Sequence, residues 1–170
     1  LFRGERYFLS YKHMTITVEY LSDYPEHTFP ISLAFYKKRK PFIPQMRIER
    51  VARGFRHSRN KIELPLTLIA LDGKKLCGFA YITPTDDLPG FSHLKPWLSF
   101  YIFPKYRGQG IGTSFLDAVC ETARELNRHR LYLWTANHAD WFQKRGWQET
   151  AQIGLAGRSV SVLEYRLTAL

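Results

Sequence analysis

Apolar and polar residues alternate along the chain in patterns of both strand and helix type. Residues 15–20 are rich in β-branched side chains and predict a strand. Residues 64–71 and 75–83, separated by Asp72-Gly73, predict an antiparallel hairpin, because Asp-Gly tolerates the positive φ of a tight turn. The nearly unbroken apolar run over residues 97–103 predicts a buried strand in the middle of a sheet.

Helical spacing marks four further segments. After turn residues at 22–25, a helix is expected to about residue 38, with Pro30 near its first turn, where a missing N–H costs little. Residues 45–57 predict a second helix, whose apolar positions recur at i, i+3, i+4 and i+7. A third is expected over residues 111–127 and a short fourth over 139–145, which Gly146 would end.

Short strands complete the pattern. Residues 130–134 predict one, and the segments on either side of Ala156-Gly157 predict a final pair. Mixed helices and strands without a linker or a break in composition indicate a single α/β domain over residues 14–170. Residues 1–13 are interpreted as an extension or as residual expression-tag sequence.

Positive charge is concentrated in one part of the chain. The formal net charge is +10, and the segment 37–61 alone holds ten basic residues against one acidic residue, Glu49. Such a block suggests a nucleic-acid surface. The alternative is a solvated helix face, which we favour because Phe42 and Phe55 are the aromatic residues available there for stacking on bases. Binding of nucleic acid is therefore not expected.

Several classes of protein are disfavoured. The longest uncharged apolar runs, such as residues 64–71, fall far short of the ~20 residues that cross a bilayer, and no secretory signal is recognisable near the amino end. Cys77 and Cys120 are too few for a disulfide framework or a zinc site and are interpreted as buried thiols. We expect a cytoplasmic protein that binds no metal and is a monomer or a homodimer.

A glycine-rich turn, Arg107-Gly108-Gln109-Gly110-Ile111-Gly112, stands between the buried strand and the third helix. Strand, glycine-rich turn and helix together bind phosphate, because the glycines bring backbone N–H groups close to an anion at the helix amino end. The turn lacks the Gly-Lys-Ser/Thr ending of a nucleotide P-loop. Thr113 also stands where the dinucleotide fingerprint needs glycine or alanine. A helix cap with packing glycines remains the alternative to a phosphate site.

The motif Arg107-x-x-Gly110-x-Gly112, following an apolar strand that ends at Pro104, resembles the acetyl-CoA pyrophosphate loop of the GNAT N-acetyltransferase superfamily. Residues 141–147, Trp-Phe-Gln-Lys-Arg-Gly-Trp, are similar to a second segment of that superfamily. The resemblance covers about residues 14–167. It implies a GNAT fold with a mixed central sheet, two amino-terminal helices, a cofactor-binding strand-loop-helix and a short carboxyl-terminal helix.

The resemblance also implies a site and a reaction. Acetyl-CoA would be the cosubstrate, with its pantetheine arm along the central strand and its pyrophosphate on the backbone of the glycine-rich turn. An amine of a small molecule or a peptide would attack the thioester directly, in a ternary complex. The implied cofactor-binding residues are Phe100, Tyr101, Ile102, Arg107, Gly108, Gln109, Gly110, Ile111, Gly112, Thr113, Asn137 and Phe142.

The groups that move protons are less clearly marked. Phe142 stands where the superfamily usually has the tyrosine that protonates the leaving sulfur. His93 is a candidate base or an exposed loop histidine. Ser99 and Tyr101, two apart on one strand, share a face and would order a water if that face lines the cleft, or are packing residues. Asp86 and Asp87 would attract a cationic amine, or are simply a solvated pair.

The leading hypothesis is an acetyl-CoA-dependent N-acetyltransferase. Because Phe142 has no proton to donate, a catalytically weak acetyl-CoA-binding or regulatory module is the alternative. A basic protein associated with nucleic acid is the third hypothesis.

Overall fold

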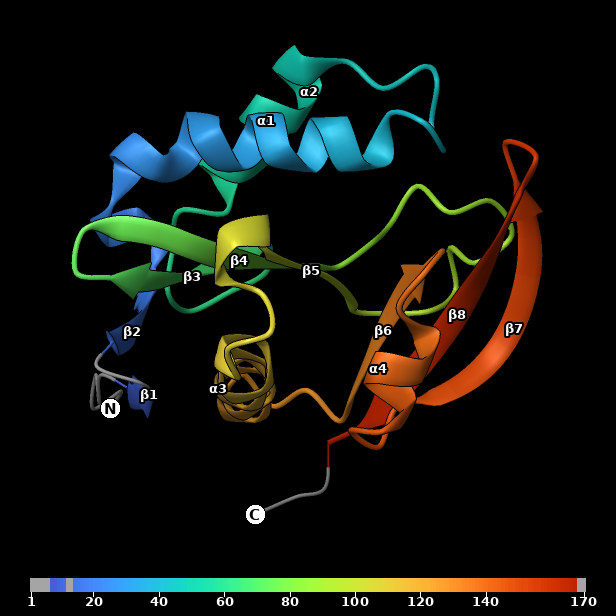
Figure 1. Ribbon diagram of the computed structural model, residues 1–170. Coiled ribbons are helices and arrows are strands. Elements are labelled where there is room, and N and C mark those ends of the chain that lie inside the picture. Colours follow the sequence, from blue (N-terminus) through green and yellow to red (C-terminus); the bar gives the residue numbers. More distant parts are fainter. Residues whose placement is uncertain (1–6, 12–13, 168–170) are drawn as a thin grey trace.

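The computed structural model describes residues 7–11 and 14–167 and contains an eight-stranded sheet in the order β1-β2-β3-β4-β5-β6-β8-β7 (Figure 1). The strands are β1 Tyr7–Tyr11, β2 Met14–Tyr20, β3 Leu66–Asp72, β4 Lys75–Thr83, β5 Trp97–Ile102, β6 Arg130–Thr135, β7 Gln148–Leu155 and β8 Arg158–Arg166. Each neighbouring pair is antiparallel except β5 and β6, which run parallel. The mixed sheet expected from the sequence is confirmed.

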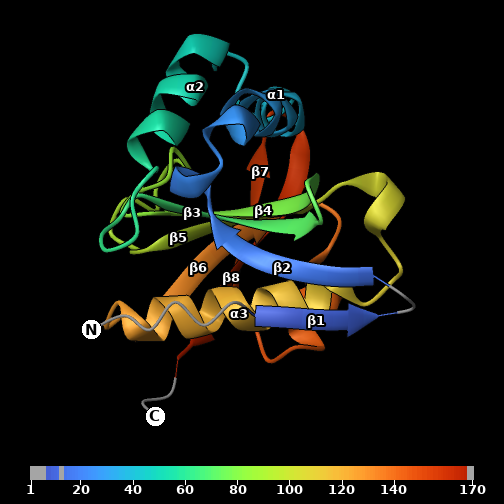
Figure 2. The same cartoon turned by 90° about the vertical axis from the view of Figure 1, so that its left-hand side faces the viewer.

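Helices cover both faces of the sheet (Figures 1 and 2). The helices α1 (Thr28–Arg39) and α2 (Ile48–His57) lie on one face, where Ile31 and Phe55 pack against Phe79 of β4. On the other face lie α3 (Ile111–Glu125) and α4 (Ala139–Gln143), with Phe115 in the largest apolar cluster. Because successive side chains of a strand point to opposite faces, β4 contributes to both clusters.

The first helix begins later than its sequence pattern predicts. Two short 3-10 turns, Leu21–Asp23 and Pro25–His27, occupy the start of the expected helix, and α1 itself begins at Thr28. Pro30 is therefore the third residue of α1, where a missing N–H leaves no intrahelical hydrogen bond unmade. The remaining helices and strands lie within a few residues of their predicted bounds.

Part of the amino-terminal segment belongs to the sheet. Residues 7–11 form β1, which pairs with β2 from Tyr7 opposite Val18 to Tyr11 opposite Met14. Residues 1–6 and 12–13 lie outside the described part of the chain. The strand predicted at 15–20 is thus not the edge of the sheet, because β1 covers it.

The sheet opens between β5 and β6. Trp97 of β5 and Tyr132 of β6 are the register pair that joins the two strands, and the Tyr132 N–H donates to the Pro96 carbonyl at 3.0 Å. Beyond this point the strands diverge, so the last three residues of β5 pair with β4 alone. The divergence exposes backbone groups of a central strand, which an ordinary sheet would bury in hydrogen bonds.

Gly78 of β4 fixes the position of the diverging strand. A Cβ atom at Gly78 would lie 2.6 Å from the Tyr101 carbonyl oxygen and 2.7 Å from Cδ1 of Ile102. Gly78→Ala is therefore expected to push β5 away and to lower the free energy of unfolding by roughly 1–3 kcal/mol in urea denaturation. Gly154→Ala is the matched control, because a Cβ there meets nothing within 4 Å. Equal stability of the two variants would contradict this packing argument.

Candidate functional site

A cavity of about 740 Å³ occupies the opening between β5 and β6. Its walls come from the end of α1, the glycine-rich turn, both diverging strands, α4 and the start of β8. Eleven of the predicted site residues line it: Ser99, Phe100, Tyr101, Ile102, Arg107, Gly108, Gly110, Gly112, Thr113, Asn137 and Phe142. The residues that the sequence marked on the strand and on the turn are therefore brought together at one cavity.

The glycine-rich turn presents backbone donors to this cavity. Gly108 and Gly110 have φ values of 70° and 79°, a conformation that favours glycine, and Gly110 immediately precedes α3. The N–H of Thr113 donates back to the Gly110 carbonyl at 3.2 Å. The N–H of Thr113, the last of the expected donors, is therefore already occupied. The N–H groups of Ile111 and Gly112 have no intrahelical acceptor and are left for a ligand.

Two arginines flank the turn. Arg107 donates from Nε to the Ile102 carbonyl at 2.8 Å and lies over the Tyr101 ring. Arg145, which the sequence reasoning did not single out, donates to Oγ1 of Thr113 from Nε at 3.1 Å and from Nη2 at 2.8 Å. Its guanidinium stacks on Trp141, 3.7 Å from the ring centroid. A helix amino end and two guanidinium groups make this end of the cavity strongly attractive to phosphate.

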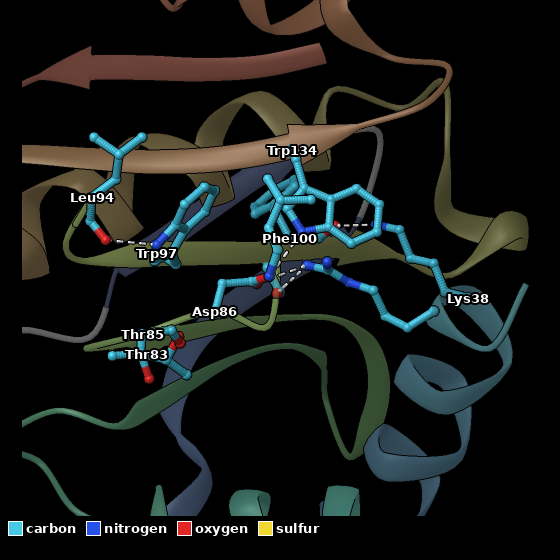
Figure 3. Close-up of polar contacts among 11 residues, drawn as sticks. Lys38, Thr83, Thr85, Asp86, Leu94, Trp97, Phe100 and Trp134 are labelled. Atoms are coloured by element: carbon cyan, nitrogen blue, oxygen red, sulfur yellow. Dashed lines mark hydrogen bonds and ion pairs between the residues drawn. The ribbon is translucent and has the colours of Figure 1, made fainter. Parts of the chain in front are cut away.

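Lys38 reaches the cavity from the last turn of α1 and was also missed by the sequence reasoning. Its Nζ donates to the Phe100 carbonyl at 3.0 Å, as Figure 3 shows, and lies 5.5 Å from the centre of the Tyr101 ring. Although the Lys38 side chain is exposed toward the cavity, the protein atoms around it desolvate the amine and, with the positive charges of Arg39 and Arg107, lower its pKa to about 7. An amine with this pKa is mostly uncharged just above pH 7, so it can accept a proton.

Arg39 lies beside Lys38 but is buried at the base of the cavity. It donates from Nη2 to Oγ of Ser99 at 2.8 Å, lies 3.6 Å from Oδ2 of Asp86 and stacks on Trp134 at 3.8 Å. Asp86 in turn accepts from Nε1 of Trp134 at 3.0 Å (Figure 3). The Ser99 hydroxyl is therefore held by Arg39, while Asp86 neutralises a buried guanidinium.

Five predicted site residues do not line the cavity with their side chains. His93 stacks against Phe91 in the loop before β5. Asp87 is exposed and lies 3.5 Å from Nη2 of Arg50. The Gln109 side chain donates to the Lys105 carbonyl and Ile111 is buried in the core, so the role predicted for these two residues depends on their backbone N–H groups. Asp86 is the fifth, and Arg39 and Trp134 hold it behind the wall of the cavity.

The charged side chains that line the cavity are all basic. Lys38, Arg39, Arg107, Arg145 and Arg158 contribute positive charge, and no carboxylate among the described residues lines the cavity. His138 also lines it, and burial, Lys38 and Arg107 lower the pKa of its imidazole. Two basic residues of the segment 37–61, Lys38 and Arg39, therefore line the cavity, whereas the sequence analysis interprets the segment as a solvated face.

Two further features are missing from the part of the chain that the structure describes. Over residues 7–11 and 14–167, no helix has the length and apolar character that crossing a membrane requires. The same residues hold no group of three or more His, Cys, Asp or Glu side chains suited to a metal ion. Burial raises the pKa of the Cys120 thiol to about 12, so this cysteine is unreactive.

Comparisons with known proteins place the fold among acetyltransferases. The profile of the Acetyltransferase (GNAT) family matches residues 19–147. The structure of yncA from Salmonella typhimurium, solved with its cofactor acetyl-CoA, is 14% identical over 90% of this chain and 94% of its own, with a TM-score of 0.65. Ribosomal-protein-alanine N-acetyltransferase from Brucella melitensis is 22% identical over 88% and 99%, with a TM-score of 0.64. A proposed acetyltransferase from Acinetobacter baylyi is 18% identical over 93% and 95%, with a TM-score of 0.69.

Proposed function

Since the chain belongs to the GNAT acetyltransferase family, we propose that it transfers an acetyl group from acetyl-CoA to an amine by direct attack in a ternary complex. The observation that carries the proposal is the cavity between the diverging strands β5 and β6, which has the glycine-rich turn at one end and Lys38 on its wall. An extended thioester that carries phosphate at one end requires a phosphate site and, next to it, exposed backbone of a strand to bind its arm. This cavity provides both.

The residues present fit acetyl-CoA. The N–H groups of Ile111 and Gly112, with Arg107 and Arg145, would hold the pyrophosphate. The carbonyls of Phe100 and Ile102 point away from β4, since Lys38 and Arg107 donate to them. Each oxygen has a second lone pair, which would accept from the amides of a pantetheine arm. Acetyl-CoA supplies an activated acyl group as a thioester. Asn137 and Phe142 would complete the wall around it.

Lys38 is the group that we propose takes the proton from the acceptor amine. Its lowered pKa makes the neutral form available, and its place beside the Phe100 carbonyl puts it next to the proposed path of the thioester. In the transfer an N–C bond forms, the C–S bond breaks, and the amine proton passes to Lys38 Nζ. Backbone N–H groups of the open edge of β5 would face the negative charge that develops on the carbonyl oxygen.

Phe142 limits how the leaving group can be protonated. Its ring is buried and packs against Phe100, Trp141 and Trp147, with no hydroxyl to donate a proton. A thiolate is a good leaving group and can depart to solvent unprotonated, so this substitution slows the reaction rather than preventing it. Tyr101 lines the other side of β5, where Lys38 and Arg107 lie over its ring.

Replacing Arg107 tests the donor site. Arg107→Gln removes a cation beside the glycine-rich turn and a hydrogen bond that positions the end of β5. We expect a dissociation constant for acetyl-CoA about tenfold higher in isothermal titration calorimetry, because a charge-assisted contact to phosphate is lost. The control is Arg128→Gln, since Arg128 is exposed beyond the end of α3 and does not line the cavity. Equal affinity in the two variants would contradict the donor site.

An acetyl-CoA-binding module is the second candidate, and Phe142 is the observation that favours it. It predicts that acetyl-CoA raises the melting temperature while no amine in a broad panel releases free coenzyme A thiol. Release of thiol that depends on an added amine would instead support the transferase.

A further inference from the structure

The cavity carries positive charge at both of its ends. Arg107 and Arg145 flank the glycine-rich turn, where the proposed function puts the pyrophosphate of the donor. Arg158 is the first residue of β8, at the tip of the β7–β8 hairpin. In Figure 1 the turn that precedes α3 lies near the centre, whereas this tip lies at the upper right, beyond the end of α1. Arg158 and the arginines beside the turn thus belong to separate segments of the cavity wall.

The Arg158 end of the cavity has an aromatic wall. The Arg158 guanidinium lies over the Phe42 ring, 5.2 Å from its centre, and Phe42 packs edge-on against Trp134 with 5.4 Å between ring centroids. These three residues come from the α1–α2 connector, from β6 and from the β7–β8 hairpin. Lys38, on the last turn of α1, lines the same cavity. An acceptor molecule entering beside Lys38 would therefore meet Arg158 and this wall.

The positive charge of Arg158 is not balanced from within the described chain. Arg39, another arginine of the lining, has the carboxylate of Asp86 3.6 Å away. No ion pair in residues 7–11 and 14–167 involves Arg158, and no carboxylate among them lines the cavity. A guanidinium that is exposed, stacked on an aromatic ring and unpaired is well suited to bind a carboxylate in bidentate fashion.

We infer that the acceptor is an amine that also carries an anionic group, a carboxylate or a group of like charge. The inference rests on the proposed function and specifies its substrate class. Arg158 binds the anionic group and Phe42 and Trp134 contact the carbon skeleton, while the amine points to Lys38. Polyamines and other purely cationic acceptors are disfavoured, because the uncompensated charge of Arg158 repels them.

The test compares acceptors that differ chiefly in one negative charge, and most cleanly among the ω-amino acids, where the carboxylate least affects the basicity of the amine. Thiol release from acetyl-CoA is measured with a set of α-amino acids and ω-amino acids of increasing length, each beside its own primary amide. We expect at least one acid to be acetylated with a kcat/KM about 10- to 100-fold above that of its amide, as expected for one charge-assisted contact. Equal rates within every pair would overturn the inference and leave the transferase intact. If no acceptor in the set caused thiol release, the proposed function and this inference would both be contradicted.

Replacing Arg158 tests whether this residue causes the preference for the acid over its amide. Arg158→Gln should lower kcat/KM for the preferred acid about 10- to 100-fold, mainly through KM, and leave its amide and the affinity for acetyl-CoA unchanged. Arg158→Lys should recover part of the loss. Arg166→Gln, at the opposite exposed end of β8, is the control that should keep the preference. An unchanged preference in Arg158→Gln would overturn the inference.

Discussion

Lys38→Met is expected to lower kcat for acetyl transfer about 100-fold while leaving the dissociation constant for acetyl-CoA nearly unchanged. Methionine keeps a chain of similar length in the cavity but cannot accept a proton. A steady-state thiol-release assay measures kcat, and calorimetry measures the affinity for acetyl-CoA. A loss of this size is typical of the removal of a general base, whereas a structural contact at the cavity wall would alter affinity as well.

The pH profile gives the second readout. Burial and the charges of Arg39 and Arg107 lower the pKa of Lys38 to about 7, and the neutral form is the one that accepts a proton. Activity of the native chain should therefore rise as the pH increases through about 7. Lys38→Met should lose this rise and retain only the rise at higher pH that reflects ionisation of the acceptor amine itself.

Two variants separate the proton transfer from general effects of charge. Lys38→Arg keeps a positive charge but cannot be deprotonated near pH 7, so it should be as inactive as Lys38→Met. Lys37→Met removes the same charge from the exposed neighbouring residue and should remain active. Full activity of Lys38→Arg would contradict the assignment of Lys38 as the base.

Local sequence patterns account for the donor side of the site. An apolar strand, two glycines at positive φ and a helix with apolar spacing are all encoded by residues that are close in the chain, and the structure brings them to one cavity. The backbone supplies much of this site. A pattern of glycines can therefore predict it without knowledge of any long-range contact.

The acceptor side depends on contacts between distant segments. Lys38 is 62 residues from Phe100, and Arg39 is 60 residues from Ser99. The sequence nevertheless contains a signal that these two residues face inward. Lys38 follows the buried residue Ile31 by seven positions, and Arg39 follows the buried Ser32 by seven, so both basic residues stand on the face of α1 that packs on the sheet. Counting the charges of residues 37–61 as one block concealed this difference between faces.

In the loop before β5, the sequence offers only the charge of the aspartates as a guide to their role. Asp86 and Asp87 are adjacent and chemically alike, yet Asp86 contacts Arg39 and Trp134 whereas Asp87 is exposed beside Arg50. Which of two neighbouring carboxylates points inward depends on a loop conformation that no periodic pattern encodes. His93 of the same loop illustrates the point, since its ring stacks on Phe91 instead of reaching the cavity.

Asp86→Ala should be among the most destabilising substitutions in the protein, lowering the free energy of unfolding by about 3–5 kcal/mol. It leaves the buried guanidinium of Arg39 without its countercharge. It also removes the acceptor for Nε1 of Trp134 and for the N–H of Leu88, each at 3.0 Å. Urea denaturation measures the loss, and Asp87→Ala is the matched control, which should change stability by less than about 1 kcal/mol because its ion pair is exposed.

A double variant distinguishes the lost countercharge from the lost hydrogen bonds. If the uncompensated charge of Arg39 causes most of the destabilisation, Arg39→Met combined with Asp86→Ala should be more stable than Asp86→Ala alone, since no unpaired charge remains buried. If the hydrogen bonds to Trp134 and Leu88 dominate, the second substitution should add its own cost. Because Arg39 also holds Ser99 at the base of the cavity, the double variant should bind acetyl-CoA less tightly even where its stability recovers. Recovery of stability together with loss of binding would assign Asp86 to the support of the site rather than to contact with the acceptor.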